Sequence, residues 1–402
     1  MPTATSRRPA DGREAGRRST HELRPEGAKG KKKRKSKVRS PLWAKLLTIF
    51  GAITLVAGFG GVVMAKSYIG QLTDSIETGQ VLDADSLKND APDAASALKG
   101  PIDLLLLGLD TREGWAPNTS RADTIIVLHI PASHDQAYLM SIPRDAYMDI
   151  PSYTKAGWHG GKDKANAAFF LGSQKNQGWK GGAALTASMV NKATGLKFNG
   201  VVVIDFNGFK RIIDALGTVY MCVDHETVSD HYIVENGKPV YAKGKPTGVF
   251  YKNSYKHKVG CRDMPGWEAL DFSRQRKGGA NGDYDRQRHQ QQLIKAMAKK
   301  ASSAGIISNP AKVGALISAA GSALKMDTGN VAVDDFIFAL KSIAGADLLM
   351  LKSNGGTYNS ADVNGMSAEM LSGNTLEMFE AAKNDQLGQF ILAHPEFLNR
   401  EK

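Results

Sequence analysis

The sequence predicts an α/β domain in which one sheet is covered by helices on both faces, preceded by a single transmembrane helix. Three observations support this prediction. Short apolar runs rich in Val, Ile and Leu alternate with helix-like segments over residues 102–303. Residues 46–65 contain no charged side chain. The chain has 402 residues, of which 42% are hydrophobic, and this is enough apolar material for at least one full core.

The positive charge of the chain lies almost entirely in its N-terminal tail. The formal net charge is +12, but residues 1–45 hold 15 Lys and Arg against 4 Asp and Glu, which leaves a net of +1 for the rest. The tail is rich in Gly, Pro and Arg up to the basic run 31–39, so we expect it to be disordered. A duplex-binding domain needs a basic face of its own, and the near-neutral body therefore argues against nucleic acid as a partner.

Residues 46–65 form the candidate transmembrane helix. Twenty uncharged residues between Lys45 and Lys66 are long enough to cross a hydrocarbon layer of about 30 Å. The excess of Lys and Arg before this span places residues 1–45 in the cytoplasm and the chain after Lys66 outside the cell membrane. A signal peptide cleaved near Ala65 is the alternative, although both the leader and the apolar run are long for one. The basic tail then acts either as a solvated topology signal or as a contact to anionic lipid.

The two cysteines, Cys222 and Cys261, are expected to form a structural disulfide. Outside the membrane a pair of cysteines tends to oxidise. Neither residue lies in a CxxC motif or near a His at metal-ligand spacing, which argues against a zinc or redox role. The bond would close the polar segment 223–260.

The extracytoplasmic part divides into a polar stalk, residues 66–98, and one domain, residues 99–400. Apolar, β-branched runs predict strands, the first of them buried on both faces, at Ile102–Leu109, Thr124–Ile130, Ala137–Ile142, Gly200–Asp205 and Leu348–Lys352. Helical patterns predict helices at Gly182–Thr194, Gly208–Leu216, Trp267–Arg274, Arg286–Ser303, Ala311–Leu324, Val333–Ala344 and, as the final one, Thr375–Ala382.

Charged side chains gather beside the ends of the predicted strands, where sheets of this class bind ligands. Guanidinium groups match phosphate oxygens, and carboxylates are the ligands that Mg²⁺ prefers. Any single Arg–Asp pair would usually be a surface ion pair, but five charged segments together predict a site for a phosphate anion and a divalent metal. The chain contains no GxxxxGK(S/T), GxSxG or HExxH motif. The charged and polar side chains concerned are Asp110, Arg112, Arg121, Asp123, Arg144, Asp145, Lys164, Asn166, Arg274, Arg276, Asp283, Arg286 and Arg288.

Six segments, taken in order along the chain, resemble the successive signature blocks of the LytR–CpsA–Psr family. The basic tail and the single anchor before them are also similar to that family. The segments are LLLLGLDTR (104–112), SRADTIIVLHI (120–130), MSIPRDAYMDIP (140–151), DKANAAFFLG (163–172), VVVIDFNGFKRIIDALGTVYMCV (201–223) and GWEALDFSRQRKGGANGDYDRQRHQQQLIKA (266–296).

The resemblance implies an α-β-α sandwich with a central mixed sheet and an apolar tunnel for a lipid. It further implies a phosphotransferase of the cell membrane that depends on Mg²⁺, or Mn²⁺, and whose catalytic domain is extracytoplasmic. Such an enzyme moves a glycopolymer, for example teichoic acid, arabinogalactan or capsule, from a polyprenyl-pyrophosphate carrier to a hydroxyl group of peptidoglycan. The implied partners are the lipid-linked polymer, peptidoglycan and the membrane.

Site residues follow from the same resemblance, position by position. Asp110 and Asp123 would hold the metal, and Asp145, Lys164, Asn166 and Asp283 would orient the site. From the chemistry of the transfer, rather than from the resemblance, Asp145 and Asp283 are the candidates to accept the proton of the attacking hydroxyl. The implied catalytic set is Arg144, Asp145, Asp283 and Arg286. The pyrophosphate would be bound by Arg112, Arg121, Arg144, Lys164, Asn166, Arg274, Arg276, Arg286, Gln290 and Gln291.

One position departs from the family pattern. Where the family usually places a second Arg beside the Gln run, this chain has His289, with Arg288 directly before it. A shift of one residue on a helix turns a side chain by about 100°. Arg288 is therefore ranked below Arg286 as a phosphate ligand.

Three other functions compete with transfer. With water as the acceptor, the same site would make a polyprenyl-pyrophosphate phosphatase. A membrane-anchored regulator is a second alternative, but a 45-residue basic tail leaves no room for a helix-turn-helix domain. A wall-binding protein without turnover is the third.

Overall fold

The computed structural model describes residues 76–88, 99–111, 118–246, 248–277, 279–306, 309–329, 331, 333 and 347–399. The predicted transmembrane span 46–65, the basic tail and nearly all of the predicted helix 333–344 lie outside these residues. Among the helices that are described, none combines the length and the apolar character needed to cross a membrane.

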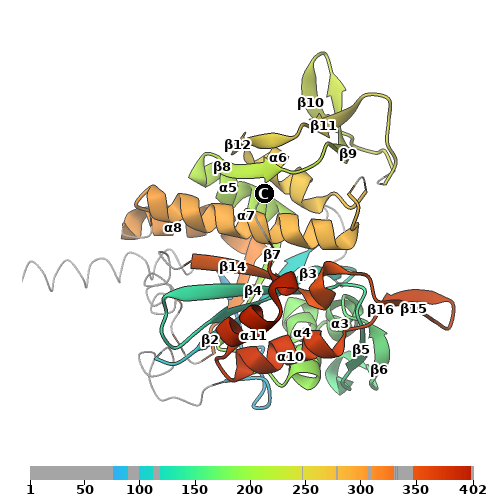
Figure 1. Ribbon diagram of the computed structural model, residues 1–402, viewed down its shortest axis with the longest axis vertical. Coiled ribbons are helices and arrows are strands. Elements are labelled where there is room, and N and C mark those ends of the chain that lie inside the picture. The colour runs from blue at the N-terminus through green and yellow to red at the C-terminus, as the bar shows by residue number, and fades with distance from the viewer. Residues whose placement is uncertain are drawn as a thin grey trace, which may run out of the picture. The chain divides into compact units, whose positions relative to one another are not determined.

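A seven-stranded mixed sheet forms the centre of the domain (Figure 1). Strand β2 pairs in parallel with β7 and antiparallel with β3, which in turn pairs antiparallel with β4. The prediction of an α/β fold with a mixed central sheet is confirmed. In spatial order the strands are β1 (Glu77–Thr78), β13 (Leu324–Asp327), β7 (Gly200–Asp205), β2 (Ile102–Leu109), β3 (Ala122–Ile130), β4 (Gln136–Ile142) and β14 (Asp347–Lys352).

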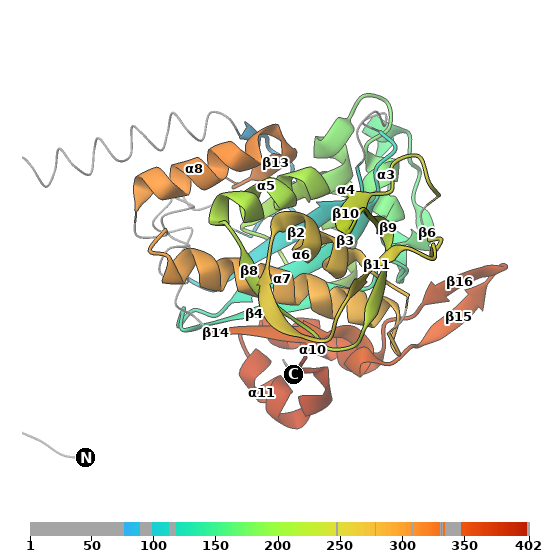
Figure 2. The same cartoon turned by 90° about the horizontal axis from the view of Figure 1, so that it is seen from above.

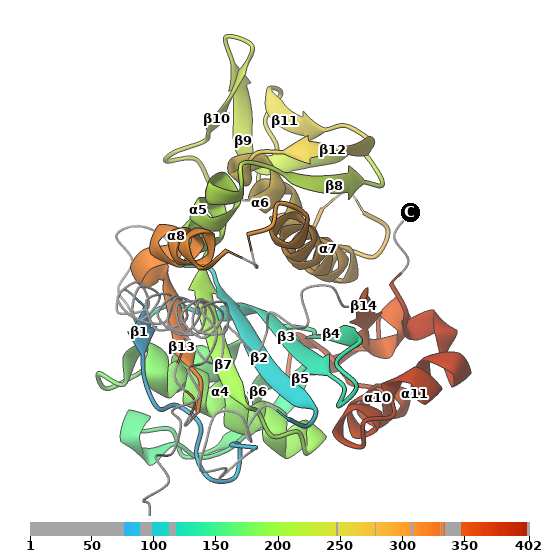
Figure 3. The ribbon, with the colours of Figure 1, turned by 90° about the vertical axis from the view of Figure 1, so that its left-hand side faces the viewer.

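Helices cover both faces of this sheet, so the predicted sandwich is also confirmed (Figure 3). On one face lie α3 (Ala167–Gly172), α4 (Gly178–Thr194), α10 (Gly373–Lys383) and α11 (Leu387–Ala393). The other face carries α5 (Phe206–Leu216), α6 (Gly266–Arg274), α7 (Asp283–Ser303) and α8 (Pro310–Ala320). Figure 2 shows this layer from outside, with α8 beside β13. Short 3₁₀ turns occur at Thr154–Ala156, Gly321–Ala323, Ser353–Gly356 and Pro395–Phe397.

The alternation of side chains along β2 explains why its sequence is apolar throughout. Leu105 and Leu107 pack into the core under α4, whereas Ile102 and Leu104 pack into the core under α8, and all four are buried. The strand is therefore buried on both faces, as predicted. Leu106 also points to the α8 side but is only partly buried.

Two predicted helices in the C-terminal region need correction. The pattern at 311–324 predicted one helix, but α8 ends at Ala320 and β13 begins at Leu324. Gly321 has φ +54°, a conformation that ends an α-helix and that L side chains rarely adopt. Thr375–Ala382 corresponds to α10 but is not the final helix, because α11 follows it.

A set of antiparallel strands, here called the β-lobe (residues 219–264), projects from the layer of α5, α6 and α7 (Figures 1 and 3). It was not predicted, since the segment 223–260 was expected only as a polar stretch. One pair joins β8 (Val219–Val223) to β12 (Gly260–Met264), and three further strands lie in the order β10 (Lys238–Tyr241), β9 (Thr227–Glu235) and β11 (Ser254–His257). Two hairpins elsewhere are β5 (Tyr147–Ile150) with β6 (Gly161–Lys164), and β15 (Ser360–Val363) with β16 (Met366–Glu369).

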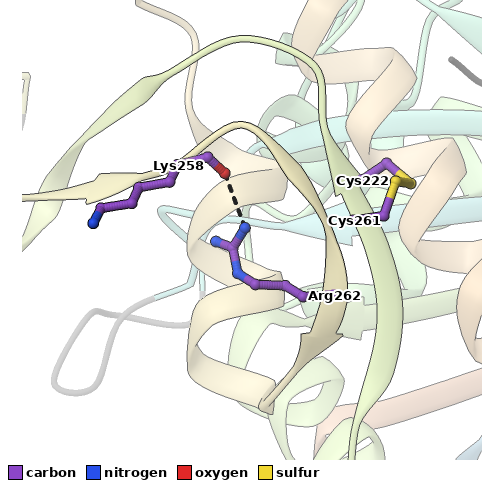
Figure 4. The surroundings of a disulfide bond; sticks show 4 residues. All are labelled: Cys222, Lys258, Cys261 and Arg262. Carbon is purple, nitrogen blue, oxygen red and sulfur yellow. Dashed lines mark hydrogen bonds between the residues drawn. A yellow bond between two sulfur atoms is a disulfide. The ribbon is translucent and has the colours of Figure 1, made fainter.

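The predicted disulfide closes the base of the β-lobe. Cys222 and Cys261 are directly opposite each other in β8 and β12, and their sulfur atoms are bonded (Figure 4). Beside the bond, Arg262 donates a hydrogen bond from Nη1 to the carbonyl oxygen of Lys258, at 2.9 Å. The bond therefore ties together the two strands through which the chain enters and leaves the lobe.

Candidate anion-binding site

The pairing of the central strands brings charged segments far apart in the chain to one edge of the sheet. Because β3 runs antiparallel to both β2 and β4, the end of β2, the start of β3 and the end of β4 lie at the same edge. Asp110 follows β2, Asp123 lies near the start of β3, and Arg144 comes two residues after β4. The sheet itself therefore places these three side chains together.

A β-bulge at Asp123 contributes to this arrangement. Gly108 pairs with Thr124, but Leu109 pairs with Ala122, so Asp123 is the extra residue on β3. An extra residue interrupts the regular alternation of side chains, and bulges often redirect a side chain beside a functional site. Asp123 is a lining residue of the pocket at this edge.

This edge holds a pocket of about 170 Å³. Five of its side chains are Arg or Lys and three are Asp, so the lining is cationic overall. Seven residues predicted from the sequence are among those that line it: Asp110, Asp123, Arg144, Arg274, Arg276, Arg286 and Gln290. Five further lining residues were not predicted: Phe206, Asp230, His231, Gly248 and Lys277.

Arg144 lies at the centre of the charged network. Its Nη1 is 2.9 Å from Asp123 Oδ2, and its Nε is 3.5 Å from Asp145 Oδ2 and 3.9 Å from Asp283 Oδ1. Burial alone would lower the pKa of Arg144, but these three carboxylates raise it. Its Nε is buried and donates no hydrogen bond to the described part of the chain. A buried donor without an acceptor indicates a place where a ligand oxygen can bind.

The first turn of α7 supplies Arg286 and Asp283. Gly282, directly before the helix, has φ +47°, and a Cβ there would collide with the hydroxyl of Tyr358, so glycine is required. Arg286 Nη2 lies 2.8 Å from Asp283 Oδ1. Burial would raise the pKa of Asp283, but Arg286, Gln287 and Arg144 lower it, so this carboxylate is ionised at neutral pH. The Nε atom of Arg286 is buried and donates no hydrogen bond to any described residue.

Several predicted residues that the structure describes are not among those that line the pocket, and they include Arg121, Asp145, Lys164, Asn166 and Asp283. Lys164 Nζ is 3.0 Å from Asp145 Oδ1. Asn166 accepts a hydrogen bond from Arg121 and donates one to Asp123, both at 3.4 Å. These contacts hold the carboxylates that pair with Arg144, and the predicted roles of Arg121, Asp145, Lys164 and Asn166 toward a ligand stay predictions.

Arg274 is held against the ring of Phe206, a residue that was not predicted to belong to the site. Its guanidinium lies 3.8 Å from the ring centroid of Phe206, and its Nη2 lies 3.4 Å from Asp110 Oδ1. This cation–π contact fixes the plane of the guanidinium beside the pocket. Phe206 lies within one of the six segments that resemble the family, and Lys277 follows Arg276 directly. Both could therefore have been selected as site residues from the sequence. Asp230, His231 and Gly248 of the β-lobe lie outside these six segments, so the sequence did not indicate them.

The prediction that Gln291 binds pyrophosphate is corrected by its surroundings. Its side chain is fully buried and donates hydrogen bonds to the carbonyl oxygens of Leu139 and Leu351 and to Ser141 Oγ. Its amide oxygen accepts a bond from Asn399. Gln291 therefore joins α7 to strands β4 and β14. The neighbouring Gln290 lines the pocket, because successive side chains on a helix point about 100° apart.

Two neighbouring substitutions should separate these roles. We expect Gln291→Ala to lower the free energy of unfolding by about 3 kcal/mol, since several buried polar groups lose their partners. Gln290→Ala should leave the melting temperature unchanged and weaken pyrophosphate binding about tenfold, which is the usual effect of losing a bond to a charged group. Calorimetric melting and titration of both variants would check this. Equal melting temperatures for the two variants would contradict the assignment.

Arg288 and His289 both lie outside the anion pocket. Arg288 Nη2 is 2.5 Å from Asp224 Oδ2 and 3.1 Å from Asp285 Oδ1. The side chain of His289 is buried. Its ring stacks on Phe272 with 4.1 Å between the ring centroids, and its Nε2 lies 3.2 Å from Asp224 Oδ1. The charge of Arg288 is thus already paired with two carboxylates beside a second cavity, of about 540 Å³. Arg112, a further predicted phosphate ligand, lies outside the described residues.

The carboxylates of the pocket fit a shared metal ion rather than a metal held by the protein alone. No group of three His, Cys, Asp or Glu side chains suited to a metal occurs in the described part of the chain. Asp110 and Asp123 do line the same pocket as the arginines. Mg²⁺ commonly takes one or two carboxylates from a protein and its other ligands from phosphate and water. The two residues present meet that requirement.

Comparison with known proteins agrees with this architecture. One similar protein is the polyisoprenyl-teichoic acid–peptidoglycan teichoic acid transferase TagU of Oceanobacillus iheyensis, 26% identical over 74% of this chain and 80% of that protein. Another is the probable cell wall biosynthesis protein LcpB of Corynebacterium glutamicum, 31% identical over 60% of this chain and 50% of LcpB. The solved structure "TagT bound to LIIa-WTA" shares the fold, with a TM-score of 0.53 and 23% identity over 76% of this chain and 96% of that one.

The sequence model of one protein family matches most of the chain. The match extends over residues 70–385, which include every residue that lines the anion pocket. The chain therefore belongs to the LytR–CpsA–Psr family.

Proposed function

We propose that this protein is a membrane-anchored extracytoplasmic phosphotransferase of cell wall assembly. It transfers a glycopolymer from a polyprenyl-pyrophosphate carrier to a hydroxyl group of peptidoglycan. The observation that carries this proposal is the single pocket in which Arg144, Arg274, Arg276 and Arg286 meet Asp110 and Asp123. The name of the similar protein TagU, a teichoic acid–peptidoglycan transferase, supports the same reaction class.

The charge pattern of the pocket suits a diphosphate group. Several guanidinium groups can each donate two parallel hydrogen bonds to phosphate oxygens. A single phosphate would need fewer of them, whereas a diphosphate carries more negative charge and more oxygen atoms. The buried Nε atoms of Arg144 and Arg286, which donate no hydrogen bond to a described residue, are available for those oxygens.

The apolar side of the sheet supports a lipid carrier. Leu106, Leu128 and Val202 lie on the face covered by α8, and they remain only partly buried although they lie within the central strands. The anion pocket lies at the edge of this same sheet. A polyprenyl chain running from the pocket along this face would complete the burial of these side chains, which favours binding of an apolar chain.

The arginines would supply most of the catalysis. The acceptor hydroxyl attacks the phosphorus atom bonded to the sugar, the bridging P–O bond breaks, and polyprenyl phosphate leaves. Negative charge then builds up on the transferred group and on the leaving phosphate, where Arg144, Arg274, Arg276 and Arg286 can stabilise it. Asp110 and Asp123 would hold Mg²⁺ or Mn²⁺, which when bound neutralises phosphate charge.

A carboxylate accepts the proton of the attacking hydroxyl in this scheme. Asp283 is ionised, and its lowered pKa makes it a weak base. Asp145, more exposed and 3.0 Å from Lys164, is the other carboxylate beside Arg144.

The decisive experiment follows both products of the reaction. Full-length protein in detergent is incubated with a polyprenyl-pyrophosphoryl oligosaccharide labelled in the sugar, with and without Mg²⁺ and peptidoglycan. Transfer predicts labelled sugar phosphate on peptidoglycan and an equal amount of polyprenyl phosphate, with both products requiring the acceptor. Release of polyprenyl phosphate at the same rate without peptidoglycan would identify a phosphatase instead, and binding without turnover would identify a wall-binding protein.

A further inference from the structure

The β-lobe contributes an imidazole to the anion pocket. His231 lies in β9, is 7% exposed, and lines the pocket together with Arg274, Arg276 and Lys277. It is a pocket residue that the proposed mechanism does not use. Its neighbours show how the ring is oriented and which charge it carries.

Two carboxylates meet the ring of His231 at the same nitrogen atom. Nδ1 lies 3.1 Å from Asp271 Oδ1, within a hydrogen bond, and 2.8 Å from Asp230 Oδ1. Asp271 has a fully buried side chain and also binds His257 Nε2 at 2.8 Å and Gln275 Nε2 at 2.9 Å. Asp271 is thus hydrogen-bonded to His231, His257 and Gln275. Because these contacts fix the carboxylate, they also fix the plane of the His231 ring.

The other ring nitrogen has no such partner. Nε2 of His231 makes no hydrogen bond with any described residue, and it is not among the fully buried polar atoms that lack a partner. With Nδ1 facing Asp230 and Asp271, the opposite side of the ring is the side that can line the pocket. A proton on Nε2 would therefore be donated into the space between the arginines.

The surroundings of His231 favour its doubly protonated form. Burial alone would lower the pKa of His231, but the contacts to Asp230 and Asp271 outweigh burial and the opposing charge of Arg274, so the pKa is raised. Burial would also raise the pKa of Asp271, yet His231 and His257 lower it to about 2, which keeps this carboxylate ionised. The other charged groups that line the pocket are Arg144, Arg276, Lys277, Arg286, Asp110 and Asp123.

We propose that His231 is a phosphate-binding residue of the pocket that acts as an imidazolium, so that affinity for the pyrophosphate group depends on pH. The proposal rests on the proposed function, in which this pocket holds a pyrophosphate. The remaining cations of the described lining are Arg and Lys, which stay charged over the physiological range, whereas His titrates within it. Binding should be tight below the raised pKa of His231 and weaken as pH rises through it.

The test uses inorganic pyrophosphate as the probe and full-length protein in detergent at a constant Mg²⁺ concentration. Affinity is measured by calorimetric titration from about pH 6 to about pH 9, the interval in which His loses its charge. His231→Gln should bind about tenfold more weakly than wild type at the low end and equally at the high end. His231→Arg, which keeps a cation at every pH, should bind tightly across the whole range. Pyrophosphate itself titrates here, so the variants are compared with wild type at each pH.

A second variant tests the carboxylates behind the ring. Asp230→Asn removes one of the two negative charges at Nδ1, so it should move the loss of affinity to lower pH. A purely structural role for His231 would give a ratio of wild-type to His231→Gln affinity that is the same at every pH, and this result would overturn the inference.

The experiment also distinguishes failure of the inference from failure of the proposed function. If wild type does not bind pyrophosphate at any pH, the proposed function itself is wrong. If wild type binds, and Arg144→Ala abolishes binding while His231→Gln leaves the pH profile unchanged, then only the role of His231 is wrong.

Discussion

Replacing Arg144 with Ala is expected to lower the rate of glycopolymer transfer by at least about a hundredfold, the usual effect of removing one main electrostatic stabiliser of a transition state. Arg144 is the residue that joins the charged segments of the site. Its guanidinium lies close to three carboxylates from different segments: Asp123 of β3, Asp145 of its own loop and Asp283 of α7. The measurement is the steady-state rate with a lipid-linked donor and peptidoglycan as the acceptor.

The same substitution should also affect stability to a small extent. Without Arg144, Asp123 and Asp283 lose a common positive neighbour, and we expect the free energy of unfolding to fall by about 1–2 kcal/mol. Arg262→Ala is a matched control, because Arg262 of the β-lobe has its Nη2 2.6 Å from Glu268 Oε1 of α6 and lines no part of the anion pocket. It should lose comparable stability and keep its transfer rate. A control that lost activity to the same degree as Arg144→Ala would show that the effect reflects stability alone.

The double variant Asp110→Asn, Asp123→Asn should lose the dependence of pyrophosphate binding on Mg²⁺. Both carboxylates line the pocket, and Asn is a much weaker ligand for a hard cation. In the absence of metal, binding should be as tight as in wild type or tighter, because Arg274 and Arg144 are released from Asp110 and Asp123. Titration of pyrophosphate with and without Mg²⁺ measures both effects, and transfer should fall by at least about a hundredfold.

Asp230→Asn serves as the control for this double variant. Asp230 also lines the pocket, but it pairs with His231 and accepts a hydrogen bond from the backbone of Gly248 at 3.0 Å. Its replacement should leave the stimulation by Mg²⁺ intact. Persistence of full Mg²⁺ stimulation in the double variant would exclude Asp110 and Asp123 as the metal ligands.

Most secondary structure of the sheet could be predicted because burial leaves a local pattern. Predicted strands at 102–109, 137–142 and 200–205 match β2, β4 and β7 to within one residue. The β-lobe was missed for a related reason. Its longest strand, β9, alternates buried and partly exposed side chains, and its segment TVSDHYIVE contains no continuous apolar run.

Site residues likewise fall into those that residue type and spacing could indicate and those that depend on packing. Arg144, Arg274 and Arg286 could be selected because guanidinium groups beside strand ends are a chemical signal in the sequence. That Gln290 faces the pocket and Gln291 faces the sheet depends on the rotation of α7 about its axis, which adjacent glutamines do not reveal. The approach of His231 to the pocket depends on how the β-lobe packs against α6, a contact made through Asp271.

The amino-acid sequence by itself determined which segments are buried, which side chains can bind phosphate and metal, and to which family the blocks 104–296 are similar. These properties depend on residue type and on spacing along a few turns of chain. Tertiary structure alone decided that β3 lies antiparallel between β2 and β4, so that Asp110, Asp123 and Arg144 share one edge. It also decided that a lobe closed by Cys222 and Cys261 brings His231 to the same pocket. Both outcomes depend on pairing between distant segments, and the free energy of such pairing comes from packing that no local pattern records.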